Sequence, residues 1–414
     1  MSGSKRWVTL VTLVTITALL LSGCAPSATP TPQVVEKLIT KEVVKLVTPT
    51  PAPTAPPVPL PDVIHLGTYL AMTGANAALG QQVYEGVSLA LKQHPQVLGK
   101  TIKLTLVDNR SDKTEAAVAV SRLIEAEKVI GIVGTSGSSL AIPGAEVAEK
   151  AGIPVVFTTP TNPLVTSGKK WSFRVCFIDP FQGSVVAKYA FEKLGVKTAA
   201  VIQDVAQDYS VGLASFFRDA FTTLTKDKKT IVSFTSYQTG DTDFSAQLTH
   251  AISKNPDMIF TTGYYGEAAL LIRQARELGY KGIIMGGDAL DAPELIKIAG
   301  PAADGVLFST HYHPQGATNP TAKAFVEDYK KEYGKEANAF AALGYDAYLV
   351  LTAAIEKAGS VQPEAIRQAL EATKNFEGVS GTITLDANHN AIKDAVIKGV
   401  KNGAFVYLDT VPAQ

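Results

Sequence analysis

Residues 129–161 read VIGIVGTSGSSLAIPGAEVAEKAGIPVVFTTPT. An apolar run at 129–133 leads into the small polar turn Thr135–Ser139, apolar residues then recur at helical spacing over 141–150, and a second apolar run covers 153–157. A strand, a helix and a strand in this order are typical of parallel sheets with right-handed crossover connections. The stretch therefore predicts an α/β protein.

The same alternation extends through most of the chain. The helix expected at 113–127 is entered through Asp112, and Glu115 stands three residues on, at the spacing of a capping box. Because about 350 residues remain after the N-terminal segment, more than one typical core, we expect two lobes. Further strands are expected at 63–66, 102–106, 198–203, 231–234, 258–262 and 282–285, and further helices at 83–91, 183–194, 211–221, 244–253 and 267–278.

Polar and aromatic residues follow the expected strands at the points where each strand ends. In open α/β sheets, ligands bind beyond the carboxyl ends of the strands. Two such units could be two independent Rossmann-like domains or two lobes around a cleft, and a cleft between two facing lobes would collect all of these segments. The segments are Thr135–Ser139, Thr158–Thr161, Asp204–Tyr209, Gly263–Tyr265 and Gly286–Asp288.

The N-terminus has the three-part form of an export signal. Lys5 and Arg6 precede an apolar run from Trp7 to Leu21, which stops at Gly23. The run is shorter than the ~20 residues that a membrane-spanning helix needs. We therefore expect residues 1–23 to be a removable signal peptide.

Leu21-Ser22-Gly23-Cys24 resembles the bacterial lipobox, which implies cleavage before Cys24 and a lipid anchor on its thiol. The alternative is an ordinary secretory peptide that contains a cysteine. Residues 24–61 are rich in Pro and Thr at both ends, as a membrane tether would be. With Cys24 lipidated, Cys176 has no disulfide partner, and its apolar surroundings favour a buried small side chain over a reactive thiol.

Composition and motifs argue against several classes of protein. Lysine and arginine together number 38, as do aspartate and glutamate, so the basic excess of a nucleic-acid-binding surface is absent. Gly134-Thr135-Ser136-Gly137 is not a nucleophile elbow, and we expect no catalytic residue and no cofactor. His311 and His313 are too few for a metal site, so we expect them to be surface residues and expect no metal.

Different short motifs follow one another in a characteristic order from about Asp62 to the end of the chain. They are Met72-Thr73-Gly74 with Gly80, Gly134–Ser139, Ala151–Pro154, Phe173-Arg174, Asp243-Phe244, Arg273–Ala275 and Gly344–Ala347. Their order and spacing resemble those of the periplasmic leucine/isoleucine/valine-binding proteins. The resemblance implies a type I periplasmic-binding-protein fold: two Rossmann-like lobes with parallel sheets, joined by three hinge crossovers and closing on a ligand. It implies lobe 1 at 62–178 plus 311–378, and lobe 2 at 179–310 plus 379–414.

A free amino acid is a zwitterion, so its site needs donors for the carboxylate and acceptors for the ammonium. Ser138 and Ser139 stand at the start of an expected helix, where the resemblance implies the grip on the carboxylate; the alternative is that they only cap the helix. Thr159 and Thr161 match positions that hold the ligand through a carbonyl and a hydroxyl. Thr158 stands where relatives often carry proline.

The resemblance implies that the other lobe contributes Tyr209 and Tyr264, which would close over the ligand, and Asp288, which would meet the ammonium. The alternatives are ordinary interfacial or core tyrosines and a helix-capping aspartate. Phe340 is a candidate wall of the pocket or a core residue. Leu79 lies where branched-chain binders often have an aromatic residue.

The function implied is that of the substrate-binding component of an ABC importer, served by a permease and an ATPase in separate chains. The expected ligand is amino-acid-like, with branched-chain amino acids first. A ligand-sensing receptor domain for signalling or regulation remains open, as does an importer component for aromatic acids or amides.

Overall fold

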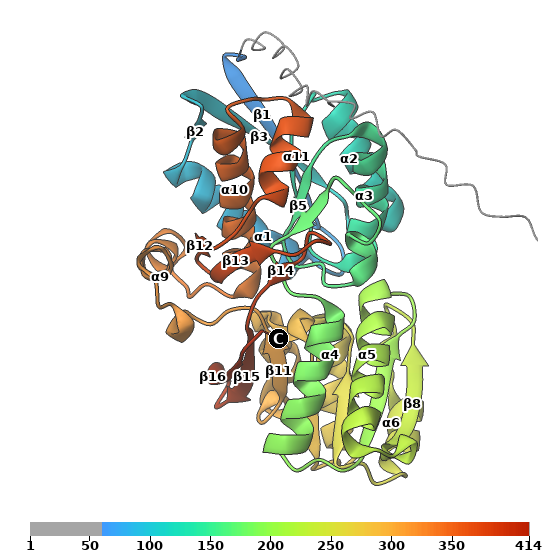
Figure 1. Ribbon diagram of the computed structural model, residues 1–414. Helices are drawn as coiled ribbons and strands as arrows, with labels where there is room; N and C mark the ends of the chain where they lie inside the picture. The colour runs from blue at the N-terminus through green and yellow to red at the C-terminus, as the bar shows by residue number, and fades with distance from the viewer. Residues whose placement is uncertain (1–59, 414) are drawn as a thin grey trace, which may run out of the picture. The chain divides into compact units, whose positions relative to one another are not determined.

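The computed structural model describes residues 60–413. The expected signal peptide, Cys24 and all but the end of the tether lie outside the described residues. The described chain forms two lobes, each built on its own sheet with helices packed against it (Figure 1). The α/β class and the two-lobe architecture are therefore confirmed.

The sheet of lobe 1 has the order β2-β3-β1-β4-β5-β6, parallel except where β2 meets β3. β4 and β5 are wholly buried, because helices cover both faces of the sheet. The strands are β1 (Val63–Leu70), β2 (Gln96–Val97), β3 (Lys100–Asp108), β4 (Ile132–Gly134), β5 (Val155–Phe157) and β6 (Ser172–Arg174).

Helices of lobe 1 come from both ends of the described chain. α10 is the one described helix long and apolar enough to cross a membrane, and because 83% of its apolar window is buried it is a core helix. A Cβ on Gly86 of α1 would lie 1.9 Å from the carbonyl oxygen of Ala341, so glycine lets α1 and α10 touch backbone to backbone. The helices are α1 (Ala77–Gln93), α2 (Lys113–Glu125), α3 (Ser138–Ala151), α9 (Pro320–Tyr333), α10 (Ala339–Ala358) and α11 (Pro363–Glu371).

The predicted N-cap of α2 is confirmed. The carboxylate of Asp112 accepts hydrogen bonds from the backbone N–H groups of Thr114 and Glu115, at 2.7 and 2.9 Å. The helix ends at Glu125, two residues earlier than its periodicity predicts.

The sheet of lobe 2 has the order β16-β15-β11-β10-β9-β7-β8. The sheet is parallel as expected from β11 to β8, and at its other edge β11, β15 and β16 pair antiparallel. β15 and β16 form a hairpin whose turn, Asn402-Gly403, has positive φ at both residues (52° and 73°), as a type I′ turn requires. The strands are β7 (Ala199–Asp204), β8 (Ile231–Tyr237), β9 (Met258–Thr261), β10 (Ile283–Gly286), β11 (Leu307–Thr310), β15 (Ala395–Lys401) and β16 (Ala404–Val411).

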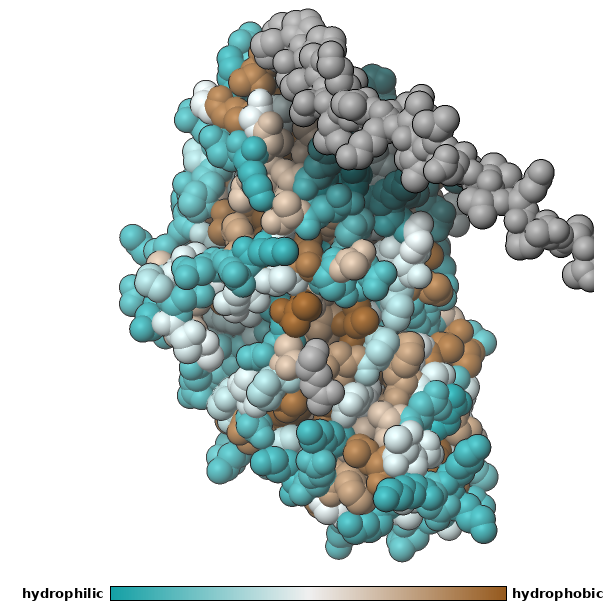
Figure 2. Space-filling model, viewed as in Figure 1, coloured by the Kyte–Doolittle hydropathy of each residue, from teal (hydrophilic) through white to brown (hydrophobic). Residues whose placement is uncertain are grey.

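The helices of lobe 2 connect its parallel strands, and α4 and α5 lie side by side (Figure 1). Hydrophobic residues gather on the face shown in Figure 2 around the end of α4 where the chain enters the lobe. The helices are α4 (Asp179–Lys188), continued by the π-helical turn Tyr189–Lys193, α5 (Asp208–Thr225), α6 (Ser245–Ile252), α7 (Tyr265–Glu277) and α8 (Pro293–Ala299), with the short 3₁₀ turn η4 (Asp288–Leu290) after β10.

The chain passes between the lobes at 175–178, 311–319 and 393–394. Before the last passage it forms a small antiparallel sheet of β12 (Phe376–Gly378), β13 (Gly381–Leu385) and β14 (Ala391–Ile392).

Contacts of this small sheet bear on the lobe boundary. The backbone N–H of Arg174 donates to the carbonyl of His389 at 3.1 Å, and the rings of Phe173 and His389 stack with centroids 4.2 Å apart. Because these partners belong to β6 of lobe 1, we propose that lobe 1 extends to about residue 392 instead of 378.

Candidate functional site

The segments that follow the parallel strands meet around one small cavity. From lobe 1 come the turns after β4 and β5, and from lobe 2 the turns after β7, β9 and β10. The cavity has a volume of about 10 Å³, near the minimum that holds one water molecule, so the lobes are closed over it. Its walls are Gly137, Ser138, Thr159, Tyr209, Tyr264, Asp288, Ala289 and Phe340.

Most of the predicted site residues are thus brought together. Ser138, Thr159, Tyr209, Tyr264 and Asp288 line the cavity, whereas Ser139 and Thr161 do not. Larger cavities, of about 1010 and 600 Å³, lie at the opposite edge of the lobe 2 sheet and beside the hinge passages. None of the predicted site residues lines either of them.

The lobe 1 wall combines a helix N-terminus with free hydroxyl groups. Ser138 is the first residue of α3, and its Oγ accepts a hydrogen bond from the backbone N–H of Asn162 at 3.1 Å. Gly137 has φ +94°, and a Cβ there would lie 2.8 Å from the hydroxyl of Tyr264. Both the backbone conformation and the lack of space therefore require glycine at this position. The buried hydroxyl of Thr159 has no partner among the described residues, which leaves it available to a ligand.

The loop that carries Thr159 is held by a buried arginine. Arg174 is wholly buried and donates to the carbonyls of Pro160 and Asn162, at 2.7 and 3.0 Å, and to the hydroxyl of Thr166 at 2.8 Å. Burial lowers the pKa of Arg174 below its ordinary value. These bonds fix the backbone between β5 and the first passage.

Neighbouring threonines have structural contacts. Thr158 donates its hydroxyl to the carbonyl of Thr135 at 2.9 Å. The carbonyl of Thr161 accepts from the N–H of Asp179 at 2.9 Å, so Thr161 joins the loop to α4. Burial raises the pKa of Asp179 well above its ordinary value.

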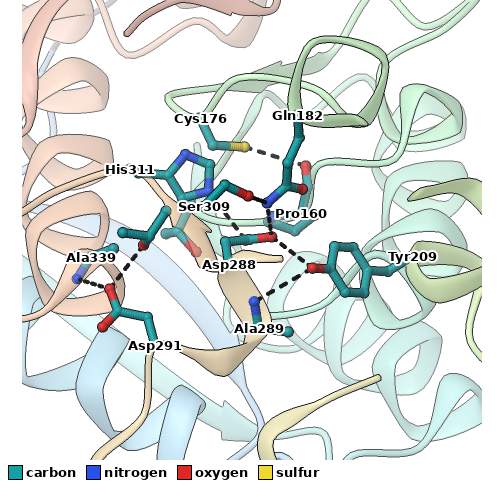
Figure 3. Close-up of polar contacts among 12 residues, drawn as sticks. Pro160, Cys176, Gln182, Tyr209, Asp288, Ala289, Asp291, Ser309, His311 and Ala339 are labelled. Carbon is teal, nitrogen blue, oxygen red and sulfur yellow. Dashed lines mark hydrogen bonds and ion pairs between the residues drawn. The ribbon is translucent and has the colours of Figure 1, made fainter. Parts of the chain in front are cut away.

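Asp288 lies at the centre of the lobe 2 wall (Figure 3). Its Oδ1 accepts from Nε2 of Gln182 at 2.8 Å and from the hydroxyl of Tyr209 at 2.9 Å, and its Oδ2 lies 3.1 Å from Nε2 of His311. Its side chain makes no hydrogen bond that caps η4, so the helix-cap alternative has no support. A carboxylate has about four acceptor positions, which leaves one for a ligand.

Burial sets the protonation of the residues around Asp288. It raises the pKa of Tyr209 well above its ordinary value, and the charge of Asp288 adds to this, so the phenol remains a donor. Burial also raises the pKa of Tyr264 and lowers that of His311. Cys176 is buried, and its pKa is raised to about 12, which confirms the expectation of an unreactive side chain.

Sequence reasoning missed two of the groups that hold Asp288, Gln182 and His311. The expectation that His311 and His313 are surface residues is wrong, because both are buried, 2% and 8% exposed. The ring of Phe177, from the first passage, covers His311 with the two centroids 3.8 Å apart.

Within residues 60–413 no three His, Cys, Asp or Glu side chains are grouped to hold a metal ion.

Ser139 makes its contacts across the lobes instead of in the cavity. Its Oγ accepts from the N–H of Asp208 at 2.7 Å and donates to Oδ2 of Asp208 at 2.8 Å. Lys113 Nζ lies 3.0 Å from the same oxygen, and Nδ2 of Asn162 donates to the carbonyl of Asp208 at 2.7 Å. We call Lys113, Ser139, Asn162 and Asp208 the latch.

The charge of Asp208 is stabilised by these contacts. Burial alone would raise its pKa, but the hydrogen bonds from Ser139 and Lys113 outweigh burial and lower the pKa below its ordinary value. The latch is therefore complete at neutral pH and is lost only when the pH falls through that lowered pKa.

A second set of interlobe contacts lies at the start of α10. Asn338 donates to the carbonyl of Asp291 at 2.6 Å. The N–H of Ala339 donates to the carboxylate of Asp291 at 3.3 Å (Figure 3). The same carboxylate forms a buried ion pair with Lys398, 2.9 Å away. Tyr265 adds a hydrogen bond to the carbonyl of Ala75 at 3.0 Å.

A sequence model of the family described as periplasmic binding protein matches residues 63–404. A Leu/Ile/Val-binding protein homologue from Brucella melitensis is 32% identical over 78% of this chain and 86% of its own. This chain belongs to the periplasmic leucine/isoleucine/valine-binding protein family. The predicted family and fold are thereby confirmed, and membership places the protein among exported substrate-binding proteins.

Solved structures of similar proteins have the same fold. A leucine-binding protein from Thermotoga maritima is 49% identical, with a TM-score of 0.81, and the match covers 84% of this chain and 99% of that one. A solute-binding protein of an ABC transporter from R. palustris, in complex with benzoate, is 26% identical with a TM-score of 0.77, covering 85% and 97%.

We predict that Ser139→Ala and Asp208→Ala both shift the ligand-free protein toward open forms, because each removes the central pair of the latch. Residues in contact couple by about 0.5–3 kcal/mol, a factor of about 2 to 160 in the ratio of closed to open forms. Small-angle X-ray scattering at neutral pH should show a larger radius of gyration for either variant, with little further increase in the double variant.

Asp219→Ala is the matched control, since Asp219 lies on the same helix and pairs with Arg218 of its own lobe. Its radius of gyration should equal that of the wild type. Independent, additive changes in the two latch variants would show that Ser139 and Asp208 do not act as a pair.

Proposed function

We propose that the protein captures a branched-chain amino acid in the interlobe cleft and passes it to an ABC permease and ATPase in separate chains. The observation that carries the proposal is Asp288, a buried carboxylate at the cavity wall held by three side-chain contacts. A ligand ammonium is the group that complements it.

The remaining wall suits the rest of an amino acid. Ser138 at the N-terminus of α3 and the free hydroxyl of Thr159 are donors on the lobe 1 side, where a carboxylate would bind. Phe340 and Ala289 supply apolar surface for an aliphatic side chain. Tyr264, with its ring 5.5 Å from that of Tyr209, closes the cavity from lobe 2.

Relatives support this ligand class. The Brucella homologue is named for leucine, isoleucine and valine, and the Thermotoga protein for leucine. The benzoate complex of the R. palustris protein is the reason to keep aromatic acids as the second candidate. An acid without an ammonium would leave Asp288 buried beside it without a cation, which is unfavourable.

We further propose that the protein is a binding protein and not an enzyme. Ser138, the hydroxyl nearest to a helix N-terminus in the cavity, accepts from a backbone N–H and makes no contact with a histidine, and the histidine of the site contacts Asp288. A receptor role in signalling rests on fold analogy alone.

Lipid attachment through Cys24 completes the proposal. Acyl chains on this residue would hold the protein on the membrane, and residues 24–61 would act as a tether for the binding lobes.

We predict that leucine, isoleucine or valine stabilises the protein after unfolding and refolding have removed any bound ligand. A ligand at a hundred times its dissociation constant adds about 2.7 kcal/mol to the free energy of unfolding. A thermal-shift series with these amino acids and benzoate would measure it. Stabilisation by benzoate with no response to any of the three amino acids would contradict the proposed ligand.

For the anchor, we predict that Cys24→Ala moves the protein from the membrane to the soluble fraction, because acylation needs the thiol. Fractionation with a carbonate wash measures the distribution, and Cys176→Ala is the matched control that should stay on the membrane. A Cys24→Ala protein that withstands the wash would refute the lipid anchor.

A further inference from the structure

His311 contacts the site without lining it. It is the first residue after β11, and its side chain is fully buried. Its Nε2 lies 3.1 Å from Oδ2 of Asp288, and its ring lies tilted against that of Phe177 in the first passage, with the centroids 3.8 Å apart. The cavity wall does not include it, so it acts on a ligand only through Asp288.

The contacts of the ring decide where its proton lies. A carboxylate can only accept, so Nε2 of His311 carries the proton and donates it to Asp288. Nδ1 is buried and has no partner among the described residues. A second proton on Nδ1 would therefore be a buried donor without an acceptor, and the ring is neutral.

The three groups that hold Asp288 are thus all uncharged: the Gln182 amide, the Tyr209 phenol and the His311 imidazole. Asp291, three residues further on, differs, because Lys398 neutralises it at 2.9 Å. Within residues 60–413 no lysine or arginine lies within ion-pair distance of Asp288. The negative charge of Asp288 is therefore held in place by hydrogen bonds and is not cancelled by a basic side chain.

We propose that His311 is a positioning residue that sets the ligand class: as a neutral donor it fixes Asp288 without cancelling its charge, so the cleft selects a ligand with an ammonium over the same ligand without one. The inference rests on the proposed function and assigns the selectivity of that site to a residue outside the cavity.

The environment of His311 is consistent with a neutral imidazole ring. Burial lowers the pKa of His311 below its ordinary value; the nearby positive charge of Lys393 acts in the same direction, and Asp288 and Asp291 oppose it. A protonated His311 would form an ion pair with Asp288 and cancel the negative charge that attracts an ammonium.

The test compares leucine with its desamino analogue, 4-methylpentanoic acid, by calorimetry at neutral pH. His311→Phe keeps a ring on Phe177 but removes the donor, and should weaken leucine binding about ten- to a hundredfold while changing binding of the acid by less than about threefold. His311→Gln, which keeps a neutral N–H donor, should restore most of the preference for leucine. His313→Gln is the matched control and should bind as the wild type does.

If His311→Phe weakens the binding of both ligands equally, or weakens neither, the preference for leucine is unchanged and the inference is overturned. Equal weakening of both ligands is what a merely structural role predicts. Failure of the proposed function is seen separately, as a wild type that does not bind leucine. Nitrogen-15 NMR of the wild type gives a test that needs no variant: between about pH 6 and 8, His311 should be neutral with its proton on Nε2. A proton on Nδ1 in that range would refute the assignment.

Discussion

The buried carboxylate of Asp288 is the constraint on which the site depends. A charge removed from water must be hydrogen-bonded or paired, or it destabilises the fold. Here neutral donors from α4, α5 and the second passage hold it, and the other lobe supplies hydroxyl groups opposite. The arrangement leaves one attractive position for a cation, inside a cavity that excludes bulk water. On the proposed function, the selectivity of the site follows from this unpaired charge.

Closure does not depend on the ligand alone. The latch and the contacts of Asp291 with α10 join the lobes through groups that do not line the cavity. A ligand shifts the equilibrium only by its preference for the closed form, so these contacts add to whatever the ligand contributes. Strengthening or weakening them would change affinity without changing the shape of the cavity.

Much of the fold follows from the sequence, because strand and helix periodicities differ and the strand ends are marked by polar residues. The segments after β4, β5, β7, β9 and β10 meet as predicted. The antiparallel edge was not predicted, although Asn402-Gly403 between β15 and β16 is a hairpin signal.

The site could be predicted only in part, because the sequence does not show in which direction a side chain points. Ser138 and Ser139 are neighbours in sequence, but successive helix residues point about 100° apart, so only the first faces the cavity. His311 and Gln182 carry no local signal for their roles. Gln182 reaches Asp288 from α4, more than a hundred residues earlier in the chain, and His311 reaches it from the end of β11, the strand beside β10.

The most direct test of the account is the binding of leucine to Asp288→Ala, measured by calorimetry on folded protein. If Asp288 meets the ligand ammonium in a closed cleft, the variant leaves a buried cation without its partner, and affinity should fall by about 2–5 kcal/mol, roughly thirtyfold to several thousandfold. Binding within twofold of the wild type would contradict the account, because the charge at the centre of the site would then play no part in recognising the ligand.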